Sequence, residues 1–196
     1  MNQNTEYFQV RQKKALENYE NDIKYPNRYV FVLTNKCNLR CSFCFQVKDN
    51  LPGAFTLDDW ISVLNQIPEN SWITLTGGEP IVFKGFNDIF LKVTEKHRCN
   101  MISNGIRLSE DIIDMLISRN NFKTLSISVD NVGNTLRDVK ALQWEHAENM
   151  MRLFSKKKLI AGRTDLILDT KTVVLDENAN DLFDIHKHCI EDLSAD

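Results

Sequence analysis

The chain has 196 residues, of which 42% are hydrophobic and 26% are charged, and its formal net charge is -3. These values are typical of one soluble globular domain, and the slight excess of acidic residues predicts neither a nucleic-acid partner nor an anionic membrane partner. No apolar stretch approaches the roughly 20 residues of a membrane-spanning helix, and the first thirty residues contain no apolar signal segment. We therefore expect a cytoplasmic protein.

Apolar and polar residues alternate along the chain in a pattern that predicts strands followed by helices. Residues 5–21 are expected to form a polar helix, and the aromatic and β-branched run at 29–33 a buried strand. A helix with Thr56 as its N-cap should follow and end near Pro68. Further strands are expected over 72–76, 99–103, 124–129 and 166–175, and further helices over 86–96, after the capping residue Ser109, and over 144–157 and 181–193. This order predicts an α/β fold with a parallel sheet.

Chemically suggestive residues follow the predicted strands at the points where they end. Three cysteines follow the first strand, Gly-Gly-Glu-Pro follows the second, Ser103-Asn104-Gly105 the third and Asp130 the fourth. In parallel α/β folds, binding sites form at the loops after the C-terminal ends of strands. We therefore expect these groups, distant in sequence, to converge on one site.

The loop after the first strand carries Cys37, Cys41 and Cys44 in the spacing C-x3-C-x2-C. Five cysteines with three of them inside eight residues do not suggest a disulfide framework, and in a reducing compartment such a group indicates a metal-binding or redox site. Iron–sulfur clusters are held by cysteine thiolates, usually four. Three protein thiolates would leave one iron free to bind a substrate or a cofactor.

Two other interpretations of these cysteines remain open from the residue types alone. A tetrahedral zinc site usually has four ligands, so the fourth would come from Cys99, Cys189 or a histidine. Three unrelated buried thiols are the other interpretation, although Asn38, Arg40 and Ser42 make this loop polar. We expect Cys99 and Cys189 to be buried thiols, and the four histidines to be structural or surface residues.

The second loop of interest is Gly77-Gly78-Glu79-Pro80, directly after the second predicted strand. Two glycines allow unusual backbone geometry and a close approach of the backbone to a ligand. Pro80 fixes the direction of the chain that leaves the turn, and Glu79 offers a carboxylate near the expected cysteine loop. Taken alone, the segment is an ordinary strand-to-helix turn.

Together, the two loops resemble the radical SAM superfamily. The cysteine spacing, with Phe43 at the aromatic position, is similar to its signature, and Thr-x-x-Cys-Asn-Leu-x-Cys resembles the group of the molybdenum-cofactor cyclase and the peptide-modifying maturases. Gly-Gly-Glu-Pro matches the glycine-rich motif of that family word for word. The resemblance covers residues 28–193. It implies a partial (β/α) barrel of parallel strands with outer helices and five to six βα units. Residues 29–196 would form this core domain, which could be truncated at its C-terminus, after a helical extension over residues 1–28.

The resemblance also implies a set of ligands. Cys37, Cys41 and Cys44 would ligate three irons of a [4Fe–4S] cluster, and the fourth iron would bind the amino and carboxylate groups of S-adenosylmethionine. Phe43 would pack against the adenine. Residues 77–80 would hold the methionine amino group, because an ammonium group needs hydrogen-bond acceptors.

Two serines resemble further cofactor-binding positions of the family. Ser103 keeps the hydroxyl of the family's Thr-Asn-Gly, which lies near the cofactor, although an ordinary turn explains it equally well. Ser128 is the candidate for the methionine carboxylate or the ribose. Alternation along a strand places it on one face with Ser126 and Asp130, but Asn131 stands where the family usually has glycine.

Other polar residues match the family less specifically. A basic residue that follows the serine of strand four would be Lys140, with Arg137 close by, and either could bind a carboxylate or face solvent. Asn178 and Asn180 resemble the family's asparagine in the loop after the fifth strand.

The implied chemistry is reductive cleavage of S-adenosylmethionine to a 5′-deoxyadenosyl radical that abstracts hydrogen from a substrate. Its partners would be a flavodoxin- or ferredoxin-like reductant and a peptide or small-molecule substrate, and the motifs after strands one and two favour a peptide. No protein residue is assigned as catalytic, because the reactive chemistry belongs to the cofactor. An iron–sulfur electron carrier and a zinc-stabilised binding module remain as alternatives.

Overall fold

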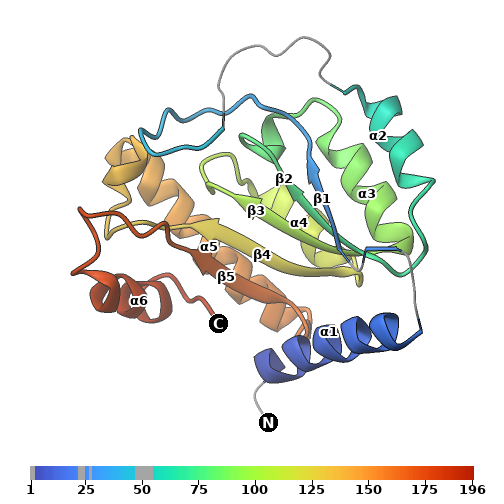
Figure 1. Ribbon diagram of the computed structural model, residues 1–196. Coiled ribbons are helices and arrows are strands. Elements are labelled where there is room, and N and C mark those ends of the chain that lie inside the picture. The colour runs from blue at the N-terminus through green and yellow to red at the C-terminus, as the bar shows by residue number, and fades with distance from the viewer. Residues whose placement is uncertain (1–2, 22–24, 27, 47–54) are drawn as a thin grey trace.

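The computed structural model describes residues 3–21, 25–26, 28–46 and 55–196 (Figure 1). Within these residues, five strands form one sheet: β1 (Arg28–Val32), β2 (Trp72–Thr76), β3 (Arg98–Ser103), β4 (Phe122–Ser128) and β5 (Ile167–Lys171). Neighbouring strands are parallel throughout, and their order in the sheet is their order in the chain. The predicted α/β fold with a parallel sheet is therefore confirmed.

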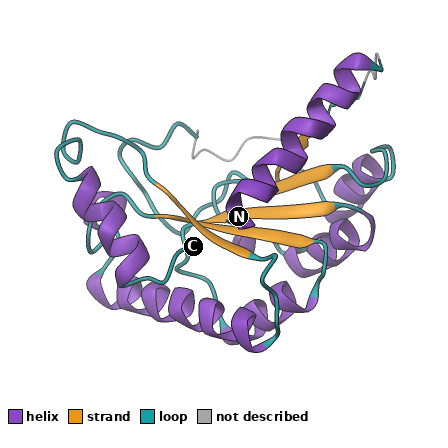
Figure 2. Cartoon of the chain, turned by 90° about the horizontal axis from the view of Figure 1, so that it is seen from below, coloured by secondary structure: helices purple, strands orange, loops and turns teal. Residues whose placement is uncertain are grey.

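The described residues also form six α-helices: α1 (Gln3–Glu20), α2 (Leu57–Leu64), α3 (Phe86–Lys96), α4 (Glu110–Ser118), α5 (Ala141–Ile160) and α6 (Leu182–Glu191). Short 3-10 helices follow β2 and β4, namely η1 (Pro80–Val82) and η2 (Thr135–Arg137). Figure 2 shows the helices of the crossover connections along one side of the sheet. Figure 1 shows α1 at the end of the molecule opposite the loop that follows β1.

The helices begin where their capping residues predict. The Thr56 hydroxyl accepts a hydrogen bond from the backbone N–H of Asp59, and the Asp59 carboxylate accepts one from the N–H of Thr56. At the start of α4, the Ser109 hydroxyl accepts a single hydrogen bond, from the N–H of Ile112. These bonds satisfy backbone donors that the first turn of a helix leaves unpaired.

One face of the sheet supplies the hydrophobic core. Ile73 and Leu75 of β2 and Leu125 and Ile127 of β4 are fully buried, at alternate positions along their strands. They belong to one cluster with apolar side chains of the crossover helices, including Phe90, Val93, Ile113, Leu116, Ala147, Met151 and Phe154. This packing holds the strand ends, and thus the loops that follow them, in fixed positions.

The opposite face of the sheet is polar near its centre. Thr74, Asn100 and Thr124 are register partners across β2, β3 and β4, and all three are buried. Two residues further along β4, Ser126 Oγ donates a hydrogen bond to Oδ2 of Asp169, its register partner on β5 (3.2 Å). This face therefore offers hydroxyl, amide and carboxylate groups below the edge at which the strands end.

β5 ends at Lys171, although the sequence predicted a strand over 166–175. Beyond Lys171, the N–H of Val173 donates to Oδ1 of Asp130 (2.7 Å) and the N–H of Leu175 to Oδ1 of Asn178 (2.8 Å). Side-chain acceptors thus bind these backbone groups, and the chain leaves the sheet. By contrast, α5 is longer than the predicted helix over 144–157 and runs from Ala141 to Ile160.

The N-terminal helix α1 falls inside the predicted helical extension over residues 1–28, and β1 begins at Arg28. The division into an extension and a core domain over 29–196 stays a prediction. Among the helices of the described residues, none combines the length and the apolar character that crossing a membrane requires.

Candidate functional site

The three cysteines lie on the loop that follows β1. Cys37 is half-buried, Cys41 is buried and Cys44 is exposed. The N–H of Cys44 donates to the carbonyl oxygen of Cys41 (3.3 Å), so these two residues share one turn. In residues 3–21, 25–26, 28–46 and 55–196, no three His, Cys, Asp or Glu side chains lie close enough together to hold a single metal ion. The thiols share one loop without surrounding one point.

The chemistry of this loop fits an iron–sulfur cluster, in which each thiolate binds its own iron. Two N–H groups point at Sγ of Cys37: the backbone N–H of Leu39 (3.4 Å) and the side-chain amide of Asn104 (3.7 Å). Hydrogen-bond donors around ligating sulfurs are among the groups that tune such clusters. The residues present therefore suit a thiolate-bound cluster.

The Gly-Gly-Glu-Pro loop packs directly on the cysteine loop. The N–H of Gly78 donates to the carbonyl oxygen of Thr34 (2.6 Å), and the N–H of Glu79 to that of Lys36 (2.9 Å). A Cβ atom at Gly77 would lie 2.5 Å from the oxygen of Thr34, and one at Gly78 would lie 2.3 Å from that of Lys36. Both positions therefore require glycine. The close approach that the two glycines allow is made to the backbone of the cysteine loop itself.

The Glu79 side chain is fully buried between the ends of β2 and β3. Its Oε1 accepts hydrogen bonds from the Ser103 hydroxyl (2.9 Å) and the N–H of Ile81 (3.3 Å), and its Oε2 accepts one from the N–H of Asn104 (2.8 Å). Burial raises the pKa of Glu79 to about 7, while the three hydrogen bonds act in the opposite direction. The carboxyl group thus ties two loops together, and its contact with a methionine ammonium stays a prediction.

The Ser103 hydroxyl is used within the protein, because it donates to Glu79 and accepts from the N–H of Gly105 (3.0 Å). The neighbouring Asn104 is the residue that reaches the cysteine loop, where its Nδ2 lies 3.0 Å from Oδ1 of Asn38. Sequence reasoning assigned a role to Ser103 and none to Asn104. The available signal was its position: a polar side chain immediately after a strand, at the edge where the site was expected.

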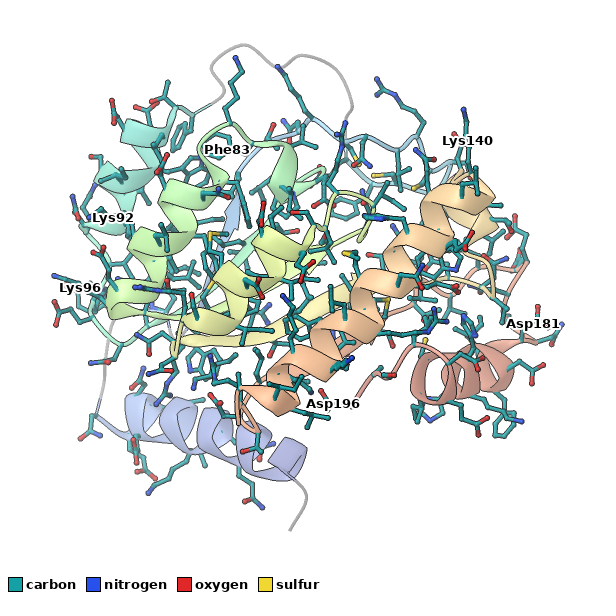
Figure 3. All side chains as sticks on the ribbon, turned by 180° about the vertical axis from the view of Figure 1, so that it is seen from behind. Phe83, Lys92, Lys96, Lys140, Asp181 and Asp196 are labelled. Atoms are coloured by element: carbon teal, nitrogen blue, oxygen red, sulfur yellow. The ribbon has the colours of Figure 1, made fainter. Side chains whose placement is uncertain are left out.

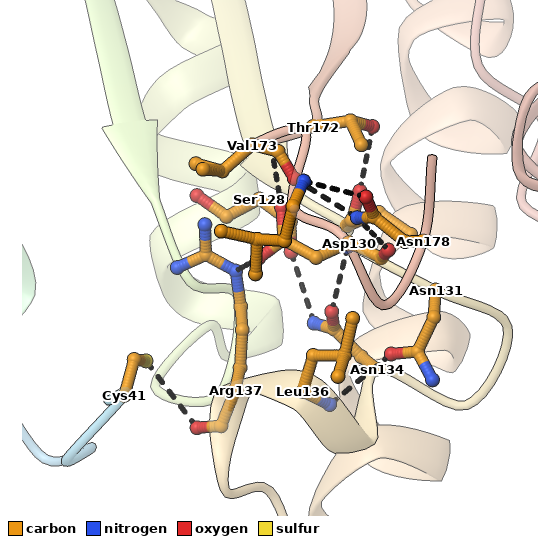
Figure 4. Close-up of polar contacts among 12 residues, drawn as sticks. Cys41, Ser128, Asp130, Asn131, Asn134, Leu136, Arg137, Thr172, Val173 and Asn178 are labelled. Atoms are coloured by element: carbon orange, nitrogen blue, oxygen red, sulfur yellow. Dashed lines mark hydrogen bonds and ion pairs between the residues drawn. The ribbon is translucent and has the colours of Figure 1, made fainter. Parts of the chain in front are cut away.

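A second group of contacts joins the end of β4 to the cysteine loop (Figure 4). Asp130 is fully buried, and its Oδ2 lies 2.5 Å from Nε of Arg137. The Arg137 guanidinium lies over the ring of Phe43, 5.4 Å from its centroid, and the Arg137 carbonyl oxygen accepts a hydrogen bond from the Cys41 thiol (3.3 Å). Arg137, predicted as one of two possible carboxylate ligands, therefore has an anionic partner inside the protein.

Two buried asparagines brace the same strand end. Asn134 accepts a hydrogen bond from the N–H of Asp130 (2.9 Å) and donates to the carbonyl oxygen of Ser128 (3.0 Å). Asn178 donates to the carbonyl oxygens of Asp130 (2.7 Å) and Val173 (2.9 Å). Figure 4 shows both amides directed at the backbone of this strand end. The loop asparagine suggested by the resemblance thus acts, at Asn178, as a link between the loops after β4 and β5.

The remaining predicted site residues differ in position. Ser128 is buried at the last position of β4, level with the other strand ends. Lys140 is exposed directly before α5, at the end of that helix nearest the cysteine loop (Figure 3). Asn180 is exposed and lies outside the contacts of Asn178. The structure therefore brings Ser128 to the edge of the site and leaves Lys140 on its outer rim.

The predicted buried thiols are confirmed. Cys99 at the start of β3 and Cys189 in α6 are both buried, and burial raises the pKa of each thiol. His97 is also buried, which lowers the pKa of its imidazole. A ring nitrogen of His146 lies 2.8 Å from the carbonyl oxygen of Leu108. These contacts and burial are those of structural residues.

Fold and site together define an α/β protein in which a three-cysteine loop and a glycine-rich loop lie side by side at the C-terminal edge of a parallel sheet. The chain belongs to the radical SAM superfamily, whose family model matches residues 31–189. Members of this superfamily use a [4Fe–4S] cluster and S-adenosylmethionine.

Three individual proteins illustrate the similarity. The sporulation killing factor maturation protein SkfB of Bacillus subtilis (strain 168) is 28% identical over 161 residues, which cover 80% of this chain and 38% of SkfB. A GTP 3′,8-cyclase of Clostridium perfringens (strain 13 / Type A) is 27% identical over 163 residues, which cover 78% of this chain and 48% of the cyclase. The chain thus spans less than half the length of either relative.

The fold is similar to that of SuiB from Streptococcus suis. In the structure of SuiB bound to the precursor peptide SuiA, the TM-score is 0.71 at 18% sequence identity, covering 96% of this chain and 42% of SuiB. SuiB has also been solved bound to S-adenosylmethionine, with a TM-score of 0.65. At this identity, the likeness demonstrates a shared fold.

Proposed function

We propose that this chain binds a [4Fe–4S] cluster through Cys37, Cys41 and Cys44 and uses it to cleave S-adenosylmethionine. When bound and reduced, the cluster would supply the electron for this cleavage, which yields the 5′-deoxyadenosyl radical that abstracts hydrogen from a substrate. The observation that carries the proposal is the docking of residues 77–80 on the cysteine loop through two backbone hydrogen bonds.

This docking favours a cofactor-binding site over a simple electron carrier. A carrier needs a ligated cluster and no second loop built to fit beside it. Here, two glycines bring the loop of residues 77–80 into backbone contact with residues 34–36, immediately before Cys37. A turn at this place can present carbonyl oxygens to an ammonium group, as the methionine end of the cofactor requires.

The side chains around the cysteines would bind and orient the cofactor. Phe43, on the cysteine loop, would pack against the adenine. The Arg137 guanidinium, which lies over the Phe43 ring, would hold that phenyl ring in place. Ser128 would face the ribose or the methionine carboxylate from the end of β4. Buried Glu79 would keep the loop of residues 77–80 in place through its hydrogen bonds to Ser103 and the following backbone.

The test is anaerobic reconstitution with iron and sulfide, reduction, addition of S-adenosylmethionine, and detection of 5′-deoxyadenosine by chromatography. We expect the wild-type chain to form it and Cys41→Ala to lose both the cluster and the product. The matched control is Cys189→Ala, which removes a buried thiol from α6 and should retain both. A cluster whose EPR signal does not respond to the cofactor, without product, would indicate an electron carrier. Bound zinc without iron would indicate a binding module.

We further propose that the substrate is a peptide. The maturation role in the name of SkfB and the precursor peptide bound to SuiB support this class. A nucleotide is the competing class, since the cyclase relative is named for GTP.

Deuterium transfer can separate the two classes. The source organism would be grown in deuterated water, and its peptide and nucleotide fractions incubated separately with the reconstituted protein. We expect deuterium in 5′-deoxyadenosine with the peptide fraction, and its loss after that fraction is digested with proteases. Transfer from the nucleotide fraction alone would reject the peptide proposal.

We also propose that a flavodoxin- or ferredoxin-like protein reduces the cluster. Cys44 is exposed, so the loop that carries it is accessible to a protein partner. Replacing the chemical reductant by a flavodoxin and its reductase should sustain formation of 5′-deoxyadenosine, and failure of both flavodoxin and ferredoxin would contradict this proposal.

A further inference from the structure

Asn104 connects the loop after β3 with the first cysteine of the motif. Its side chain is buried, with 6% of the residue exposed. Its Nδ2 lies 3.0 Å from Oδ1 of Asn38 and 3.7 Å from Sγ of Cys37, which is 67 positions away in the chain. The amide nitrogen therefore faces a group that the proposed function assigns to iron.

The orientation of this amide follows from its other contacts. Oδ1 of Asn104 lies 3.0 Å from the backbone nitrogen of Ile106, which can only donate a hydrogen bond. The oxygen must therefore be on that side, and the two amide hydrogens must face Asn38 and Cys37. The backbone is held as well, because the N–H of Asn104 donates to the buried carboxyl group of Glu79 (2.8 Å).

We propose that Asn104 is a positioning residue that raises the reduction potential of the cluster by donating an N–H group to the sulfur of Cys37. The inference rests on the proposed function, since it requires Cys37 to ligate iron. Reduction adds negative charge to a cluster, and this charge spreads onto the ligating sulfurs. A donor aimed at one sulfur stabilises the reduced form more than the oxidised form, and hydrogen bonds to sulfur are known determinants of cluster potential.

A purely structural role for Asn104 makes a different prediction. If the amide served only to brace the two loops through Asn38, then loss of either asparagine would have the same effect. If the N–H group acts on the sulfur, the two substitutions should differ, because the amide nitrogen near the sulfur of Cys37 belongs to Asn104 and is retained when Asn38 is replaced. The two roles can therefore be separated by the potential.

The experiment is an EPR-monitored redox titration of reconstituted wild-type, Asn104→Asp, Asn104→Ser and Asn38→Ala proteins, without S-adenosylmethionine. Aspartate retains the acceptor for the N–H of Ile106 and removes both amide hydrogens. Serine can also accept from an N–H two residues later but is too short to reach the sulfur. Asn38→Ala leaves the amide of Asn104 intact.

We expect both Asn104 variants to have a lower midpoint potential than the wild type, and Asn38→Ala to match the wild type. Loss of one hydrogen bond should reduce the ratio of reduced to oxidised cluster about tenfold at a fixed potential, which corresponds to about 59 mV for one electron. The aspartate shift should be larger, because it also adds negative charge.

Four outcomes would count against this inference or its basis. Unchanged potentials in Asn104 variants that carry the wild-type amount of iron would overturn it. Equal shifts in the Asn104 and Asn38 variants, or Asn104 variants that bind no iron while Asn38→Ala does, would assign Asn104 to loop bracing. A wild-type chain that assembles no cluster would instead reject the proposed function, before the role of Asn104 is reached.

Discussion

Nε of Arg137 lies 2.5 Å from Oδ2 of Asp130, a carboxylate that is fully buried at the end of β4. The same Arg137 accepts a hydrogen bond from the Cys41 thiol through its carbonyl oxygen. The ion pair therefore fixes a segment that the cysteine loop contacts. Any change that breaks this ion pair should therefore alter the position of Cys41, although neither charged group is a proposed ligand of the cluster.

Removing both partners of this pair should destabilise the protein by less than the sum of the losses caused by removing each partner alone. Arg137→Met leaves a buried carboxylate without its counter-charge, and Asp130→Asn leaves the guanidinium unpaired; each should cost about 3–5 kcal/mol in free energy of unfolding. The double variant should cost clearly less than the sum of the two. Urea denaturation of the four proteins measures the coupling, and strictly additive losses would show that the pair contributes nothing of its own.

Gly78→Ala should dislodge the loop of residues 77–80 from the cysteine loop. Its Cβ atom would lie 2.3 Å from the carbonyl oxygen and 2.6 Å from the carbonyl carbon of Lys36, and backbone cannot yield as a side chain can. We expect a loss of about 2 kcal/mol or more in free energy of unfolding, together with reduced iron binding after reconstitution.

The control for this prediction is Gly85→Ala at the start of α3. The three atoms nearest to a Cβ atom there would be Cε1 of Phe83 and Cβ and Cδ1 of Leu57, at 3.0–3.1 Å, so these side chains would have to move by only a few tenths of an ångström. This variant should bind iron like the wild type. Equal iron binding by the Gly78 and Gly85 variants would show that docking of the two loops is unnecessary for cluster assembly.

The raised pKa of Glu79 predicts a pH-dependent stability. The carboxyl group takes up its proton at a pKa of about 7 in the folded protein, against 4.5 for the exposed group. Between these values the folded state binds more protons than the unfolded state, so stability should fall as the pH rises from about 4.5 to about 7, by about 3 kcal/mol. Glu79→Gln should remove this slope, which thermal or urea unfolding over that range would detect. Parallel profiles for wild type and variant would contradict the prediction.

The contact of Lys158 with Asp196 should contribute strongly to stability. Lys158 is buried and its ammonium group bonds the carbonyl oxygen of Leu166 and Oδ2 of Asp196, which also accepts the N–H of Leu168. Asp196→Ala would leave a buried ammonium without its anion, at a cost of about 3 kcal/mol.

An exposed pair provides the comparison. Glu69 and Lys96 lie 2.9 Å apart, with 67% and 62% of their side chains exposed. Glu69→Ala should therefore change stability by less than about 1 kcal/mol. The measurement is the melting temperature of Asp196→Ala and of Glu69→Ala under the same conditions. Similar decreases in the two melting temperatures would contradict the predicted difference between the buried and the exposed ion pair.

Much of the site was predictable because its parts are local in the sequence. Each βα unit carries its own signal: an apolar strand, a loop with chemically distinctive residues, then a capped helix. Parallel pairing places these loops at one edge, so the meeting of the loops of Cys37, Gly78 and Asn104 follows from the order of elements alone.

The individual contacts were not predictable, because they join residues of different units. Periodicity could not reveal that Gly77 and Gly78 approach the cysteine loop rather than a ligand, or that Asp130 neutralises Arg137. Likewise, the end of β5 at Lys171 depends on acceptors supplied by Asp130 and Asn178, whereas residues that favour a strand continue in the sequence to Leu175. Side-chain competition for backbone groups leaves no trace in a hydrophobic pattern.

Because strand order in the sheet equals strand order in the chain, the site has a natural sequence of completion during synthesis. A ribosome delivers the cysteines first, then the glycine-rich loop with β2, and Asn104 only with β3. Asp130 and Arg137 emerge after β4, and Asn178, which bonds Asp130, follows β5. The contacts of the three thiols thus stay incomplete until four strands have paired, and we expect cluster insertion to follow release of these segments from the ribosome rather than to guide their folding.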